Sequence, residues 1–339
     1  MSRSKKKKAL IIRFSSIGDI ILTTPVIRSL ALQGDYEVHL LTHQKFTHVL
    51  KDNPHLEKIY SFEESIWTTS KRIRNHHYDI IIDLHKSIRS YLLRLFLLRK
   101  VYDFNKLRIK RWLRTKVNIS LKDDKHIALR FLDALIPLKI SYDEGGLDYY
   151  IPQKDRIVLS GRNSTKKISL IPGANFYSKT IPAEKLIDII SQWPDLDFHI
   201  LGGEKEIGKF NELNIYPNVQ NHCGKLSLSQ SASIIEQSDL IICTDTALMH
   251  ISAALKKNII SIWGGTVPGF GFYPFLPPDK GSFKIIENVG LSCRPCSKSG
   301  KTHCPKIHFN CMRTISTNTI HIEIKNYLEV NHLSINHVI

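Results

Sequence analysis

The turn Ser15-Ser16-Ile17-Gly18-Asp19 places a carboxylate directly after an apolar strand candidate, residues 9–14. Such a turn lies at the carboxyl edge of a parallel sheet, where open α/β sheets bind ligands. Gly18 accepts backbone angles that other residues resist. Asp19 falls in the first turn of the helix that follows, where its carboxylate can point into a cleft and accept hydrogen bonds. The alternative is a structural role, because an acidic first-turn residue caps a helix and stabilises its dipole.

A second polar group, residues 244–250, follows another apolar strand candidate. A helix that begins there offers free N–H groups and the positive end of its dipole, so a phosphate can bind the backbone of Thr246 and Ala247. The Thr246 hydroxyl is a further donor. Asp245 would then accept hydrogen bonds from sugar hydroxyls, and His250 lies about one turn along the helix. Alternatively, Asp245 caps the helix and His250 is a partly buried, hydrogen-bonded histidine.

Three more loops follow strand candidates. Pro172-Gly173-Ala174-Asn175 precedes Lys179, a cation that can pair with phosphate. The loop 201–206 offers Glu206 or Glu204 to a ribose diol, and the loop 264–271 is rich in glycine. Taken singly, these are also ordinary loops with a solvated lysine or acid. The sequence lacks G-x-G-x-x-G after a strand, the P-loop motif, H-E-x-x-H and G-x-S-x-G, which argues against dehydrogenases, P-loop NTPases, zincins and serine hydrolases.

Strand and helix candidates alternate along the chain, which is typical of parallel, doubly wound sheets. A polar stretch near residues 143–152 separates two such series. We therefore expect two Rossmann-like domains facing across a cleft, residues 1–155 and 156–339. A closing helix over 320–328 is a candidate to pack back on the first domain. Strands are expected at 9–14, 36–41, 59–62, 79–84, 167–171, 198–201, 239–243 and 258–263, with helices that include one from Lys45 and one over 87–93.

The chain is strongly basic, with 48 Lys and Arg against 31 Asp and Glu, a net charge of +17 and a pI near 9.5. This balance predicts an anionic partner, namely nucleic acid, a membrane surface or a phosphorylated substrate. Between residues 71 and 116, fourteen basic residues stand against three acids. There Arg89, Arg94, Arg99 and Lys100 flank apolar residues, as in a helix at an anionic membrane interface. A core helix with solvated arginines fits equally well.

The amino-terminal lysine run is followed by a short apolar stretch that Arg13 interrupts, so we interpret it as the start of a strand and not as an export signal. No apolar run approaches the roughly 18 residues of a membrane span. These features predict a cytoplasmic protein.

Six cysteines are present, and disulfides are not expected in a cytosolic chain. The last four, Cys293, Cys296, Cys304 and Cys311, include a C-x-x-C pair that could hold zinc. The second pair is spaced more widely than in a zinc knuckle, so we expect a metal-free local fold.

Together these residues resemble glycosyltransferase family 9, the lipopolysaccharide heptosyltransferase family. The resemblance runs from Ala9 to about Arg313. It rests on the first strand with its Ser15–Asp19 turn and Thr24-Pro25, on Pro172-Gly173-Ala174, and on Asp245-Thr246 with His250. Cys304-Pro305 and Cys311-Met312 also resemble the tail of some members.

The resemblance implies a GT-B fold and inverting transfer of heptose from an ADP-activated donor to the growing lipopolysaccharide core, without a cofactor. By motif, Asp19 would be the general base, with Ser15, Ser16 and Gly18 in its loop on the acceptor side. The donor side would comprise Lys179 and Thr246 for the diphosphate, Ala247 beside them, Asp245 for sugar hydroxyls, His250 supporting the diphosphate, and Glu206, or else Glu204, for the ribose.

The basic amino-terminal domain would meet an anionic lipid-linked acceptor at the inner face of the inner membrane. Ala247 stands where many relatives carry glycine, and its methyl group crowds the approach to phosphate. A related GT-B transferase with another nucleotide-sugar or acceptor glycan is therefore the alternative. A non-catalytic nucleic-acid-binding protein, suggested by charge alone, is a more distant one.

Overall fold

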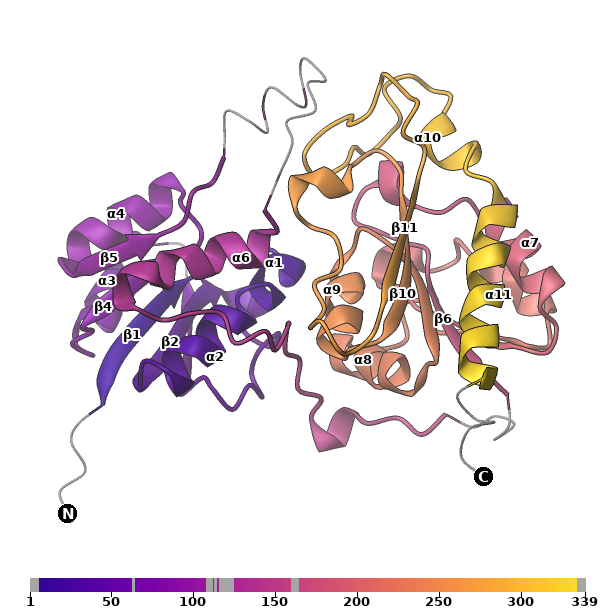
Figure 1. Cartoon of the computed structure of the whole chain (residues 1–339). Coiled ribbons are helices and arrows are strands. Elements are labelled where there is room, and N and C mark those ends of the chain that lie inside the picture. Colours follow the sequence, from indigo (N-terminus) through magenta and orange to yellow (C-terminus); the bar gives the residue numbers. More distant parts are fainter. Residues whose placement is uncertain are drawn as a thin grey trace. The chain divides into compact units, whose positions relative to one another are not determined.

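The computed structural model of the chain describes residues 6–62, 65–107, 112, 115, 125–159 and 165–333. These residues form two compact α/β units (Figure 1). The first contains the described residues up to Leu107 together with Lys125–Tyr150, and the second begins at Ile151. None of the described helices has both the length and the apolar character needed to cross a bilayer.

The first unit is built on a five-stranded parallel sheet in the order β3-β2-β1-β4-β5. The central strand β1 pairs with β2 on one side and with β4 on the other, so that Ala9 lies opposite both Val38 and Ile80. Both faces of this strand are apolar, as expected for a sheet covered on both sides. The strands are β1 (Lys7–Ile12), β2 (Tyr36–His43), β3 (Lys58–Phe62), β4 (Ile80–Asp83) and β5 (Lys100–Asp103).

Helices cover both faces of this sheet. Leu10 and Ile12 of β1 pack in one core with Leu93 and Leu97, whereas α2 packs against β2 and α6. The helices are α1 (Ile17–Ile21), α2 (Thr24–Leu32), α3 (Ile66–Arg74), α4 (Ile88–Leu97) and α6 (Ile127–Leu132), with the 3₁₀ helices η1 (Gln44–Phe46) and η2 (Asp133–Leu138). The helix expected from Lys45 is wrong, since only the three-residue η1 forms there before a series of turns.

The stretch after residue 125 is fastened to the first unit by Arg28 of α2. Its guanidinium donates to both carboxylate oxygens of Asp143 at 2.7 Å and to the carbonyl of Gly146 at 3.0 Å, and it pairs with Asp148. Arg28 is buried. This network explains why the chain as far as Tyr150 belongs to the first unit.

The second unit carries a six-stranded parallel sheet in the order β11-β10-β9-β6-β7-β8. Its inner strands β6 and β9 are almost wholly buried. The strands are β6 (Lys167–Ile171), β7 (Asp197–Ile200), β8 (Val219–Asn221), β9 (Leu240–Thr244), β10 (Asn258–Trp263) and β11 (Phe283–Glu287).

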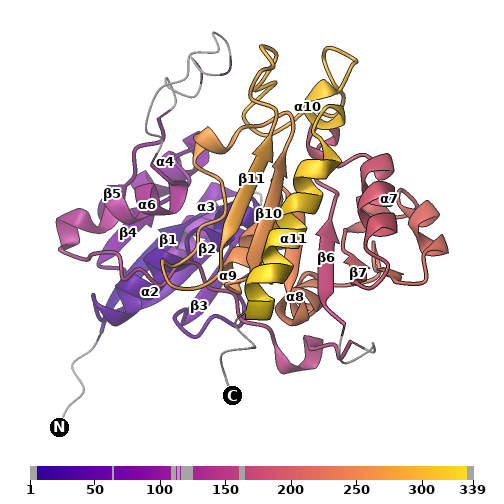
Figure 2. The same ribbon diagram turned by 45° about the vertical axis from the view of Figure 1, so that its right-hand side comes forward.

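Helix α11 (Thr317–Leu333), the last of the described helices, packs on the second unit, against α7 and β11 (Figure 2). Ile320 and Ile324 of this helix are fully buried in the core of the second unit, and packing of the same helix on the first domain stays a prediction. The helices are α7 (Ala183–Gln192), α8 (Leu228–Gln237), α9 (Ala247–Ala254), α10 (Asn310–Arg313) and α11 (Thr317–Leu333), with the 3₁₀ helices η3 (Gln153–Asp155), η4 (Tyr177–Lys179), η5 (Glu204–Glu206), η6 (Asn211–Ile215) and η7 (Pro268–Phe270).

Each sheet is doubly wound and has one point where the strand order reverses. In the first unit this point lies between β1 and β4, and in the second between β6 and β9. Loops leave such a switch point in opposite directions and open a crevice at the carboxyl ends of the strands. The switch points are therefore where each unit is built to bind a ligand.

Candidate active site

Asp19 lies beside the carboxyl end of β1, in the first turn of α1. Its Oδ2 accepts hydrogen bonds from the backbone N–H of Ser16 at 3.1 Å and from the Ser16 hydroxyl at 3.0 Å. The capping role is therefore real, but the side chain remains partly exposed. Gly18 is buried and helical, so the left-handed backbone suggested by its residue type is not used.

Arg13, which the sequence reasoning treated only as an interruption of the first strand, pairs with this carboxylate. The distance from its Nη2 to Asp19 Oδ1 is 2.8 Å, and its Nε donates to the carbonyl of Ser15 at 2.8 Å. Burial raises the pKa of Asp19, but the charge of Arg13 and the Ser16 hydrogen bonds outweigh it, so the pKa lies below its usual value. The carboxylate is thus ionised and oriented at neutral pH.

A hollow of about 530 Å³ opens at the carboxyl edge of β1 to β4. Its apolar lining is formed by three phenylalanine rings and Ile88, and its polar lining by Ser15, His43, Lys45, His85, Ser87 and Arg89. Two of these side chains are cations. A cavity with an apolar wall and a few polar groups of positive charge suits an anionic or phosphorylated sugar.

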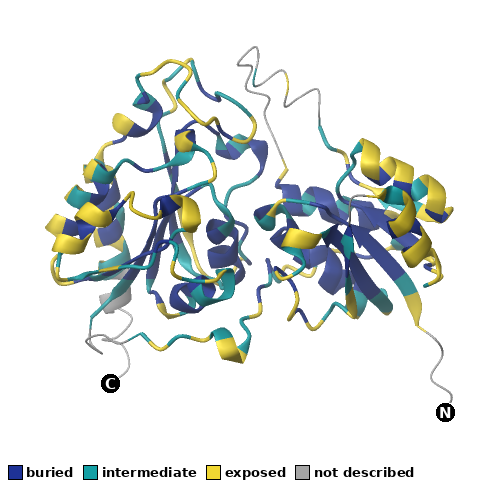
Figure 3. Cartoon of the chain, turned by 180° about the vertical axis from the view of Figure 1, so that it is seen from behind, coloured by how far each residue is buried: buried dark blue, intermediate teal, exposed yellow. Residues whose placement is uncertain are grey.

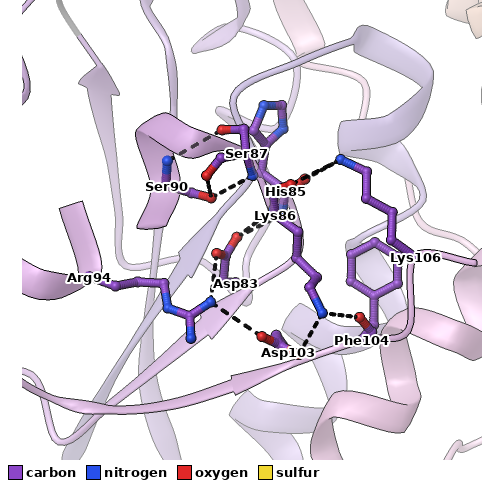
Figure 4. Close-up of polar contacts among 9 residues, drawn as sticks. All are labelled: Asp83, His85, Lys86, Ser87, Ser90, Arg94, Asp103, Phe104 and Lys106. Atoms are coloured by element: carbon purple, nitrogen blue, oxygen red, sulfur yellow. Dashed lines mark hydrogen bonds and ion pairs between the residues drawn. The ribbon is translucent and has the colours of Figure 1, made fainter. Parts of the chain in front are cut away.

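The loop that carries His85 is held by the buried carboxylate of Asp83 (Figure 4). Oδ1 of Asp83 accepts from the backbone N–H groups of His85 and Lys86 at 3.0 and 2.9 Å, and Oδ2 lies 3.2 Å from Nη1 of Arg94. Lys86 and Arg94 both also reach Asp103. This network joins the ends of β4 and β5 to α4 and fixes the wall of the hollow.

His85 is neutral at pH 7. Burial, with the charges of Arg13 and Lys106, lowers its pKa to about 4. Within the described part of the chain, its Nδ1 is buried without a hydrogen-bond partner. The ring lies edge-on to Phe14, with centroids 4.8 Å apart.

In the second unit, Lys179 and Asp245 meet at the switch point. Nζ of Lys179 lies 2.7 Å from Oδ2 of Asp245 and donates to its backbone carbonyl at 3.2 Å. The hydroxyl of Thr266, which the sequence reasoning missed, donates to the same Oδ2 at 2.9 Å. Asp245 therefore does not cap α9, and its carboxylate is presented beside the helix by two side chains from other loops.

The amino terminus of α9 follows directly. Thr246 is the N-cap residue, and it makes no side-chain capping hydrogen bond. Thr246 and Ala247 are both partly exposed, so their N–H and hydroxyl groups can reach a ligand. His250, one turn later, is 4% exposed, which leaves it behind the helix terminus and not at its surface.

Glu206 borders the loop after β6. A Cβ added to Gly173 would lie 2.3 Å from Cγ of Glu206, so only glycine allows this contact. Oε2 of Glu206 accepts from the N–H of Gly203 at 3.1 Å, and Oε1 lies 3.6 Å from Nζ of Lys209. Glu206 is buried, whereas Glu204 is exposed.

The cysteine-rich segment supports the glycine-rich loop after β10. Arg294, which is buried, donates to the carbonyls of Gly264, Trp263 and Thr266, the last at 2.9 Å, and pairs with Glu287 at 2.8 Å. The segment thereby positions Thr266 and, through it, Asp245.

All six cysteines carry free thiols. Burial raises the pKa of Cys311 to about 12, which keeps this thiol neutral. Among the residues whose positions are described, no three His, Cys, Asp or Glu side chains converge as a metal site requires.

Several sequence-predicted residues therefore gather within each unit. Ser15, Ser16, Gly18 and Asp19 share the loop after β1. Lys179 and the residues 245–247 share the switch point of the second sheet, and Glu206 touches the neighbouring loop after β6. Arg13 was detectable as a charged residue within the expected apolar strand 9–14, although β1 ends at Ile12. Thr266 lies in the glycine-rich loop 264–271 and Arg294 in the C-x-x-C pair, but no local signal shows that their side chains act across distant loops.

A sequence profile of glycosyltransferase family 9 (heptosyltransferase) matches residues 66–306. The chain is 24% identical over 295 residues to lipopolysaccharide heptosyltransferase 1 of Campylobacter coli, covering 76% of this chain and 84% of that protein. The solved structure of a family 9 glycosyl transferase from Veillonella parvula DSM 2008 aligns with a TM-score of 0.74 at 16% identity, over 97% and 99% of the two chains. ADP-heptose lps heptosyltransferase II of E. coli aligns at 0.70 with 18% identity, over 96% and 99%. The fold is thus the expected GT-B fold.

Proposed function

Because the chain belongs to glycosyltransferase family 9, the heptosyltransferase family, we propose that it transfers heptose from ADP-heptose to the inner core of lipopolysaccharide. The relatives support this choice: one is a lipopolysaccharide heptosyltransferase, and another is named for ADP-heptose. The donor is a substrate, and the reaction needs no cofactor. The observation that carries the proposal is the pairing of Lys179 with Asp245 at the uncapped start of α9.

Donor binding follows from the chemistry of this cluster. The ammonium of Lys179 and the N–H groups of Thr246 and Ala247 favour the diphosphate, and they stabilise the negative charge that develops on ADP as it leaves. Asp245, held by Lys179 and Thr266, accepts hydrogen bonds from the hydroxyls of the donor sugar. Glu206 accepts hydrogen bonds from the two ribose hydroxyls of the nucleotide, and burial holds its carboxylate in one position.

Asp19 serves the acceptor. In an inverting displacement the acceptor oxygen attacks the anomeric carbon, its proton passes to the carboxylate, and the carbon–oxygen bond to the diphosphate breaks with its electron pair on ADP. The ion pair with Arg13 keeps Asp19 ionised and oriented. Its lowered pKa makes it a weaker base than a free aspartate, so we infer that proton transfer accompanies bond formation late in the step.

The hollow, which is lined by Ser15 of the loop that carries Asp19, suits the acceptor. Lys45 and Arg89 suit a phosphorylated core sugar, and the phenylalanine rings suit the apolar face of a sugar ring. We infer that the enzyme works in the cytoplasm, at the inner face of the inner membrane, where a lipid-linked acceptor is within reach.

Two measurements on the full chain test the function. ADP and ADP-heptose should raise the melting temperature with the logarithm of ligand concentration above the dissociation constant, because they bind the folded state. UDP-sugars should raise it less. Purified protein should transfer heptose to lipopolysaccharide from a strain whose core lacks that sugar. Stabilisation by a different nucleotide-sugar would replace the donor, and the absence of any nucleotide effect would refute the transferase assignment. Salt-sensitive binding to nucleic acid without a nucleotide effect would favour the more distant alternative.

A further inference from the structure

Helix α4 carries apolar side chains on two sides. Leu93 and Leu97 pack into the core beneath the sheet. The opposite side is also apolar, at positions spaced i, i+3, i+4, i+7 and i+8, the pattern of a continuous helical stripe. Its members are Ile88, Tyr91, Leu92, Leu95 and Phe96, which are 40–79% exposed. An apolar stripe that meets water is not explained by the fold of the unit.

Helix α3 extends this stripe. Trp67 is 65% exposed, and its ring lies edge-on to that of Phe96 with centroids 5.6 Å apart. Leu98, at the end of α4, is 76% exposed. We call the α4 stripe with Trp67 and Leu98 the outer face; Figure 3 shows how much of these helices is exposed, in yellow. Contiguous exposed apolar side chains of this extent mark an interaction surface.

Cations border the outer face. Lys71 and Arg74 lie one and two turns from Trp67 on the same side of α3, and Arg89, Arg99 and Lys100 are exposed around α4. The first unit, residues 1–107 and 125–150, holds 22 Lys and Arg against 14 Asp and Glu, and so carries a net positive charge.

The described acids nearby do not offset these exposed cations. Asp83 is buried against Arg94, and Asp103 is paired with Lys86 and Arg94. Glu63 and Glu64 lie outside the described residues.

The outer face is continuous with the hollow. Ile88 belongs to the stripe, and both Ile88 and its neighbour Arg89 line the cavity. An apolar surface and a cationic pocket therefore share one rim, at the amino terminus of α4. A ligand with a lipid anchor and an anionic headgroup matches this arrangement, because its apolar anchor suits the outer face and its headgroup suits the cationic hollow.

We propose that the outer face of α3 and α4 binds the surface of an anionic bilayer and presents the hollow to the headgroup of a lipid-anchored acceptor. Apolar side chains enter the acyl boundary, and the surrounding lysines and arginines contact lipid phosphates, as in interfacial amphipathic helices. Only the identity of the acceptor rests on the proposed function.

A second copy of the chain fits this face less well. A twofold dimer would bring the same surface of two subunits together, and it would therefore oppose Arg89, Arg99 and Lys100 to their own counterparts. Like charges at such a contact repel. An anionic bilayer complements both the apolar stripe and its charge.

The test is co-sedimentation of the full chain with vesicles of phosphatidylcholine and phosphatidylglycerol, and with vesicles of phosphatidylcholine alone. The wild-type chain should bind the anionic vesicles more tightly, and salt should weaken this binding. The variant Leu95→Gln/Leu98→Gln should lose about tenfold or more of the partition coefficient, because two apolar side chains no longer enter the lipid.

The matched control is Ile136→Gln/Ile215→Gln. These isoleucines are 65% and 79% exposed, close to the 67% and 76% of the two leucines, but they lie outside the outer face. The control should bind vesicles like the wild type, and all variants should keep the same melting temperature. Equal loss in both double variants, or wild-type binding that ignores lipid charge, would overturn the proposal. So would self-association in solution that Leu95→Gln/Leu98→Gln abolishes while vesicle binding stays unchanged.

Activity separates this proposal from the proposed function. With a delipidated, soluble acceptor, Leu95→Gln/Leu98→Gln should transfer heptose at the wild-type rate, whereas with acceptor embedded in anionic vesicles its rate should fall about tenfold. Vesicle binding without transfer to any acceptor would refute the heptosyltransferase function but would still support the proposal that the outer face binds a membrane. Equal rates of variant and control on embedded acceptor would refute the surface and leave the function standing.

Discussion

A stacked histidine pair in the second unit should make this protein lose stability in mild acid. His199 of β7 and His222, just after β8, stack with centroids 5.5 Å apart, and Nδ1 of His199 lies 3.2 Å from Nε2 of His222. Burial and the charges of His222 and Lys167 lower the pKa of His199 to about 4. Burial and the charge of Lys225 also lower the pKa of His222.

The sign and size of the effect follow from linkage. An unfolded histidine has a pKa of 6.5, so between pH 6.5 and 4 the unfolded chain binds more protons than the folded one, and stability rises with pH. The stability that the protein gains from holding His199 neutral is fully present above pH 6.5 and is lost as the pH falls toward 4. At pH 5, His199 alone should lower the free energy of unfolding by about 2 kcal/mol relative to pH 7. His222 acts in the same direction.

Urea unfolding at pH 7 and pH 5 measures this loss. Trp193 and Trp263 report on the second unit, and Trp263 is 1% exposed. In His199→Gln, the difference in the free energy of unfolding between pH 7 and pH 5 should be about 2 kcal/mol smaller than in the wild type. This holds whatever stability the substitution itself costs at pH 7. The exposed His303→Gln is the matched control and should keep the wild-type difference. A His199→Gln chain that loses as much stability as the wild type between pH 7 and pH 5 would refute the reasoning.

Two further predictions concern the donor cluster. Lys179→Met should raise the dissociation constant for ADP about tenfold or more, because a charge-assisted contact to the diphosphate is lost; calorimetry measures it, and Lys284→Met on β11 should bind ADP normally. Gly173→Ala should destabilise the second unit by about 1–3 kcal/mol, because its Cβ meets Glu206 at 2.3 Å. Gly203→Ala, whose Cβ would lie 3.7 Å from Glu206, should cost much less in the same urea titration, and equal costs would contradict the packing argument.

The sequence predicts the architecture because parallel strands leave a clear pattern. The run at 79–84 is apolar throughout, as a strand buried on both faces must be, and β4 forms there. Two strands with weaker patterns were not predicted. The sequence of β5 resembles the end of a basic helix, and β11 begins with the exposed Phe283. The helix expected from Lys45 does not form, since the chain there makes only η1 and a series of turns.

The candidate site was predictable to the extent that it lies at strand ends. Asp19 and Asp245 lie at or just beyond the carboxyl ends of strands. Because β6 and β9 are parallel neighbours, the loop after β6, which leads to Lys179, lies beside Asp245. Thr266 and Arg294 act through contacts between loops that are 21 and 28 residues apart along the chain. No spacing rule encodes such contacts, because they depend on how loops pack. The two sides of α4 illustrate the same limit: the core interpretation describes the side with Leu93 and Leu97, and the interfacial interpretation of the other side stays a prediction.

The most direct test of the account is Asp19→Asn, which keeps the shape of the side chain and removes its capacity to take a proton. The account predicts that ADP-heptose binds this variant with an affinity within about twofold of the wild type, while the transfer rate falls about 10²- to 10⁴-fold. Ser16→Ala, which removes one hydrogen bond to the same carboxylate, should retain most of the activity. A transfer rate for Asp19→Asn within about threefold of the wild type would contradict the central claim that this carboxylate accepts the proton of the acceptor hydroxyl.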